Sequence, residues 1–178
     1  GFQIDAGMRL QGGSSRNPDI PKHSLSLRFR RDYGAGKLQY PLFRDAPFGD
    51  TAVEEFDFLQ LRAGFNFAWT HRHYYQARHA QYNRDQWVND LYLAMGQPGS
   101  HGRWVHLYLN GLYWGLYHVH ERPDGDFMAS YFGGESDDYD ALSSGQAKSG
   151  DTTAWNTMMS IARGNIMSPS QYAAIQEY

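Results

Sequence analysis

The chain has 178 residues, a length that suits one domain of ordinary size rather than two independent cores. With 16 Lys and Arg against 19 Asp and Glu, its net charge of -3 disfavours nucleic acid and anionic membranes as partners. The mean hydropathy of -0.67 and the lack of a long apolar run predict no membrane-spanning segment. Because Cys is absent, disulfides and thiolate chemistry are excluded, whereas the compartment stays open.

The first third of the chain predicts strands joined by turns and one long loop. Residues 6–11 alternate as a strand, and a Gly- and Ser-rich turn follows at 12–18. Residues 23–30 alternate without error, which is typical of a strand in a sheet that is wet on one side. Residues 33–55 predict a long ordered loop, and 56–63 predict a third strand.

A helix and a hairpin are predicted next. At 83–95, Trp87, Leu91 and Met95 recur at four-residue steps and Gly96 is a stop signal, so we expect a packed helix. Asn110-Gly111 then joins two β-rich runs, as in a type I′ turn. A two-residue turn pairs positions whose numbers sum to 221, and because both faces are apolar or aromatic, we expect a central hairpin.

Helices follow the hairpin, which predicts an α+β fold in which an antiparallel sheet carries packed helices. Asp124 is a candidate cap for a short helix that ends at Gly133, and residues 151–163 predict another helix. Ser168-Pro169 starts a further helix close to Tyr178, so we interpret the sequence as a single partial domain, 1–178, truncated at both ends.

The Gly/Ser turn is the first candidate site. Small residues let backbone N–H groups approach an anion, and the hydroxyls of Ser14 and Ser15 add hydrogen bonds. Arg9, Arg16 and Lys22 supply positive charge, so phosphate binding is chemically reasonable. No Walker or dinucleotide motif is present, and composition alone favours an ordinary surface turn.

Histidines and acids form weaker candidates. The predicted register places His101 opposite His120 with His118 on the same face, a set that suits zinc or iron, while Glu121 points to the other face. Without a carboxylate on that face, the polar end of a hairpin is the favoured interpretation, and we assign no metal ligand. The acidic run at 135–140 is typical of a solvated loop, and no hydrolytic triad is supported.

Several motifs, in this order, resemble the spore-coat protein H (CotH) kinase family over residues 6–142. They are AGMRLQGGSSR, PKHSLSLRF, YPLFRD, FDFLQLRAG, RDQWVNDLYLAMG and VHLYLNGLYWGLYHVHERPD. The most specific is the hairpin with its NGxYxGxYxxxE pattern, followed by the RxxGxSS turn with its downstream lysine.

The resemblance implies an atypical protein kinase that uses ATP and Mg²⁺ to phosphorylate Ser or Thr of protein substrates, in spore-coat or secreted bacterial settings. Residues 1–122 would form the sheet-rich lobe that covers the nucleotide, and 123–178 the start of a helical second lobe. The Gly/Ser turn would cover the phosphates and Lys22 would reach them. Arg84 or Asp85 would orient that lysine or the phosphates, and Glu121 would lie near the adenine.

The resemblance also places the catalytic Asp residues of such kinases downstream of Tyr178, so we expect this fragment to be inactive alone. The residues do not distinguish an active parent kinase from a pseudokinase. One alternative is a non-catalytic extracellular module that binds carbohydrate or protein, motivated by 5 Trp and 13 Tyr. A second is a histidine-ligated metalloenzyme on a small β-scaffold.

Overall fold

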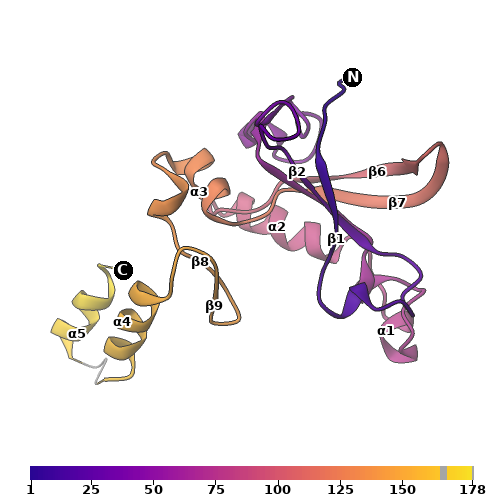
Figure 1. The fold of residues 1–178 in the computed structure, drawn as a ribbon. Coiled ribbons are helices and arrows are strands. Elements are labelled where there is room, and N and C mark those ends of the chain that lie inside the picture. The colour runs from indigo at the N-terminus through magenta and orange to yellow at the C-terminus, as the bar shows by residue number, and fades with distance from the viewer. Residues whose placement is uncertain (165–167, 178) are drawn as a thin grey trace. The chain divides into compact units, whose positions relative to one another are not determined.

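The computed structural model describes residues 1–164 and 168–177, which belong to two compact units, 1–122 and 123–178. The first unit contains a five-stranded antiparallel sheet with the order β1-β2-β5-β7-β6 (Figure 1). The strands are β1 (Gly7–Gln11), β2 (Ser24–Arg28), β5 (Phe58–Arg62), β6 (Gly102–Leu109) and β7 (Leu112–His120). Helices accompany this sheet, so the predicted α+β fold class is confirmed.

One face of the sheet carries the hydrophobic core. The alternation in β2 and β5 directs Leu25, Leu59 and Leu61 to this face, where all three are buried. The segment that was predicted as a long loop covers them, and it includes the short strands β3 (Leu38–Gln39) and β4 (Glu55–Phe56). The buried cluster is Leu25, Phe29, Leu38, Phe43, Phe56, Leu59, Leu61, Ala63, Tyr117 and Val119.

The predicted helix at 83–95 forms, but its predicted packing is wrong for the described residues. Two helices, α1 (Tyr74–Arg78) and α2 (Arg84–Ala94), lie between β5 and β6 in the chain. The polar side of α2 makes the contacts, because Gln86 donates to the Ser100 carbonyl at 3.5 Å and Asn89 accepts from the Ser100 N–H at 3.0 Å. Trp87, at the centre of the apolar side, is 62% exposed.

The β6–β7 hairpin differs from the prediction in register and in place. Tyr108 pairs with Tyr113 as predicted, but the next pair is Leu107 with Gly115, so Trp114 is an extra residue in β7. Beyond this bulge every pair is shifted by one residue, and His120 lies opposite Gly102 instead of His101. The hairpin is also not central: β6 is an edge strand and the turn extends beyond the rest of the sheet (Figure 1).

The second unit consists of short elements. They are α3 (Gly125–Phe132), β8 (Ala141–Ser143), β9 (Gln146–Ser149), α4 (Thr153–Ala162) and α5 (Pro169–Ile175). The predicted cap is present, since the Asp124 carboxylate accepts from the Phe127 N–H at 3.2 Å. The β8–β9 hairpin was not predicted, although Ser144 and Gly145 both have positive φ, as a tight turn requires. None of the helices described is long and apolar enough to cross a bilayer.

Candidate functional site

The Gly/Ser turn after β1 is held by hydrogen bonds within the sheet unit. Residues Ser14–Arg16 form one turn of 3-10 helix. The buried Ser15 hydroxyl donates to the Gln11 carbonyl at 3.3 Å, so this hydroxyl braces the turn. His23 Nδ1 lies 2.8 Å from the Ser15 carbonyl, a contact that requires the ring nitrogen to carry the proton. The turn is therefore fixed to the start of β2.

The Lys22 amine lies against β7, close to His23, the residue that holds the turn. Its Nζ donates to the Leu116 carbonyl and stands 4.4 Å from the centre of the Tyr117 ring. The Tyr117 hydroxyl in turn donates to the His23 carbonyl at 2.9 Å. Burial lowers the pKa of Lys22 from its ordinary value. Among residues 1–164 and 168–177, no carboxylate lies within ion-pair distance of this amine.

The other predicted phosphate-binding residues make contacts that do not involve Lys22. Arg9 is exposed on the edge strand β1, where it pairs with Ser26, and Ser14 is exposed in the turn. Arg84 stands over the Phe67 ring at 5.1 Å and donates to the His79 carbonyl at 3.1 Å. Arg84 is thus bound to the segment before its own helix, and no contact joins it to Lys22.

Asp85 pairs with Arg62, which is not among the predicted site residues. The Arg62 guanidinium at the end of β5 donates to Asp85 Oδ2, and both side chains are about one-third exposed, at 34% and 31%. This bond connects α2 to β5. The sequence signal was weak, because the two residues are separated by a segment whose elements were not predicted.

Glu121 is buried and bound to a histidine. Its Oε2 accepts from the His101 backbone N–H at 2.8 Å and lies 2.9 Å from His101 Nδ1. On the other side of the ring, His101 Nε2 lies 2.8 Å from the Thr51 hydroxyl. This chain of contacts connects the turn at Gly49–Thr51 to the ends of β6 and β7. The prediction that His101 and Glu121 lie on opposite faces is wrong, because the bulge shifts the register.

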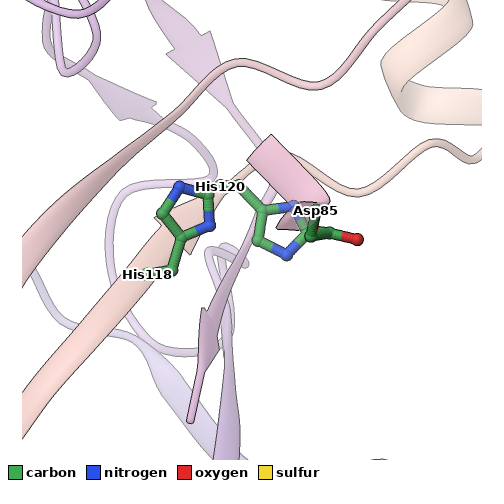
Figure 2. Close-up of side chains that lie close together, drawn as sticks. All are labelled: Asp85, His118 and His120. Carbon is green, nitrogen blue, oxygen red and sulfur yellow. The ribbon is translucent and has the colours of Figure 1, made fainter. Parts of the chain in front are cut away.

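The same shift separates His101 from the other two histidines of the predicted set. His118 and His120 lie on the face opposite the core, stacked with ring centres 5.5 Å apart. Asp85 joins them from α2, and the three possible ligand atoms lie within 4.8 Å of one another (Figure 2). Burial is the main cause that lowers the pKa of His118 to about 4 and that of His120 to about 3. Both imidazoles are therefore neutral at pH 7.

Comparison with protein families decides the affiliation. The family model described as "CotH kinase protein" matches residues 8–176, nearly the whole chain. The chain belongs to the CotH kinase family. Neither the comparison with curated proteins nor that with solved structures found a match.

In this CotH-family chain, Lys22 and the metal-like cluster lie on different faces of the sheet. Lys22 contacts Tyr117, whose side chain belongs to the core face, whereas His118 and His120 face α2. The only cluster of three possible metal ligands among the described residues contains two nitrogens and one carboxylate. Mg²⁺ prefers oxygen ligands throughout, so this cluster does not fit the magnesium of a kinase.

Proposed function

We propose that this CotH-family chain binds ATP as its magnesium complex and acts in transfer of the γ-phosphoryl group to Ser or Thr of protein substrates. The sheet unit, 1–122, covers the nucleotide in this proposal, with the Gly/Ser turn and Lys22 facing the phosphates. Phosphoryl transfer depends on positioning and on neutralising phosphate charge, which are the tasks that a braced turn and a held cation perform.

The uncompensated charge of Lys22 carries the proposal. Its amine is partly withdrawn from water, yet its partners are a carbonyl and an aromatic ring, which are both neutral. A lysine that is partly withdrawn from water is stabilised by an anionic partner, because desolvating a lone charge is unfavourable. A phosphate oxygen would supply the missing negative charge and a strong hydrogen bond. His23, bonded to both the turn and Tyr117, holds the two phosphate-binding parts together.

The proposal assigns no magnesium ligand in this chain, because the described residues hold no cluster of three carboxylates. Nor does it give Glu121 a contact with adenine, since its carboxylate already binds His101. Arg84 donates to the His79 carbonyl and Arg9 lies on β1, so the proposal gives neither guanidinium a contact with Lys22.

Isothermal titration of the purified protein with ATP and Mg²⁺ tests the role of Lys22. A charge-assisted hydrogen bond contributes about 1.5–3 kcal/mol, which corresponds to an affinity loss of roughly 10- to 150-fold in Lys22→Met. The matched control is Lys37→Met, because Lys37 has a carboxylate partner, Asp57, at 3.3 Å. Circular dichroism establishes that both variants are folded.

Equal ATP affinity in Lys22→Met and the wild type, with both proteins folded, would remove the phosphate role of Lys22. An equal loss in Lys37→Met would show that general positive charge, rather than the site, attracts the nucleotide. Transfer of labelled phosphate to a mixture of spore-coat or secreted proteins then tests the proposed kinase activity of the whole protein separately from nucleotide binding.

Exposed aromatic side chains favour carbohydrate binding as a second candidate function. On the hairpin, Tyr108 is 61% and Trp114 is 49% exposed, and rings in such positions stack on sugar faces. A glycan array with the wild type and a Trp114→Ala variant tests this function. Binding that depends on Trp114 would support it, and the absence of binding to any glycan would exclude it for the sugars on the array.

A further inference from the structure

Buried polar atoms without partners gather on the face of the sheet that α2 covers. Four such atoms, which have no hydrogen-bond partner in the described part of the chain, are Gln86 Oε1, His118 Nε2, His120 Nδ1 and His120 Nε2. Both histidines are 5% exposed, so bulk water does not compensate them. Folded proteins rarely leave such atoms unpaired, and an ion or an ordered water is the usual explanation.

The space around these atoms depends on a glycine. A Cβ on Gly102 would collide with Gln86 Oε1 and would stand 2.7 Å from His118 Nε2. Gly102 lies opposite His120 in the sheet, so the absence of a side chain at this position lets Gln86 and His118 pack closely against the strand. Any larger residue at position 102 would displace Gln86 and His118 from their present positions.

We propose that Asp85, His118 and His120 bind a divalent transition-metal ion, with Zn²⁺ as the best fit. Two imidazole nitrogens and one carboxylate oxygen form a ligand set that zinc accepts, and imidazole ligands disfavour Mg²⁺ and Ca²⁺. The three possible ligand atoms lie within 4.8 Å of one another, so side-chain rotations can bring them to a common ion. A water or Gln86 Oε1 completes a tetrahedral shell.

Arg62 supports this assignment as an outer partner of the ligand. Its guanidinium holds Asp85 Oδ2, and a carboxylate bound in this way presents its other oxygen in a fixed direction. The same ion pair limits the repulsion between the guanidinium and a bound cation. Because Asp85 belongs to α2 and the histidines belong to β7, the ion would join the helix to the sheet.

Zinc binding is measured on the purified protein, prepared without a histidine tag and stripped with a chelator that is then removed. Titration with Zn²⁺ should give one high-affinity equivalent. His118→Gln and His120→Gln should each weaken binding at least 100-fold. The matched control, His106→Gln, should bind as the wild type does, since His106 is exposed on β6 and bonds to the Tyr113 hydroxyl at 3.0 Å.

The wild type alone provides a second measurement in case the variants do not fold. X-ray absorption of the zinc-loaded protein should show nitrogen and oxygen ligands at about 2.0–2.1 Å with imidazole scattering. Absence of a tight zinc equivalent in the folded wild type would overturn the proposal and leave an ordered water as the occupant. Unchanged affinity in both folded histidine variants, or a zinc shell without imidazole, would also overturn it.

Discussion

Truncation of Glu121 to Ala is expected to destabilise the sheet unit strongly. Glu121 is 2% and His101 is 1% exposed, and the carboxylate serves both the backbone N–H and the ring of that histidine. Removing the carboxylate takes the acceptor away from two buried N–H donors of His101, and each lost acceptor costs about 1–3 kcal/mol. Since domains are stable by only about 5–15 kcal/mol, this loss is a large part of the total.

Urea unfolding, monitored by tryptophan fluorescence, measures the change in the free energy of unfolding. The variant and the wild type are compared at equal m-values. The signal reports mainly on the sheet unit, which contains Trp69, Trp87, Trp104 and Trp114. The control is Glu54→Ala, because the Glu54 carboxylate accepts a hydrogen bond from Arg44 at 2.7 Å on the surface. That variant should lose at most about 1 kcal/mol. A loss below about 1 kcal/mol for Glu121→Ala would refute the argument that this carboxylate satisfies two buried donors.

Two further substitutions test the hydrogen bond between Tyr117 and His23 and the exposed side of α2. Tyr117→Phe removes the hydroxyl that donates to His23 at 2.9 Å, so it should cost about 1 kcal/mol in urea unfolding, and an unchanged midpoint would contradict this hydrogen bond. Trp87→Gln should alter the free energy of unfolding by no more than about 0.5 kcal/mol, because Trp87 is 62% exposed. A loss above 2 kcal/mol would show that the apolar side of α2 is covered in solution.

Strand alternation was a strong predictor because one face of the sheet is buried. In β2, Leu25 and Leu27 take the core side as predicted, and their partners Leu61 and Leu59 follow the same period. A one-residue slip would expose all of these side chains, so the pattern fixes both the strand and its register. The compact fold of 33–55 could not be predicted in detail, because its short strands depend on contacts with the sheet rather than on local pattern.

Periodicity alone was misleading for α2. The four-residue spacing of its apolar residues predicts a helix correctly, but burial depends on what else is available to cover that side. In the structure, the contacts come from Asp85, Gln86 and Asn89, whose hydrogen bonds and ion pair reach Arg62 and Ser100. Such partners are 11 to 23 residues away in the sequence, and no spacing rule connects them.

The bulge in β7 explains why the predicted grouping of the three histidines was wrong. A sign of this bulge is present in the sequence. Gly115 has a φ of 123°, which a residue with a side chain rarely adopts, and a glycine inside a strand pattern often marks a bulge. The extra residue changes which side chains share a face across the pair. His101 and Glu121 therefore meet on the core side, whereas His118 and His120 turn toward α2 and its aspartate. The bulge beside Gly115 thus separates the hydrogen-bonded pair of His101 and Glu121 from the proposed metal ligands, and replacing Gly115 with a β-branched residue would disturb both at once.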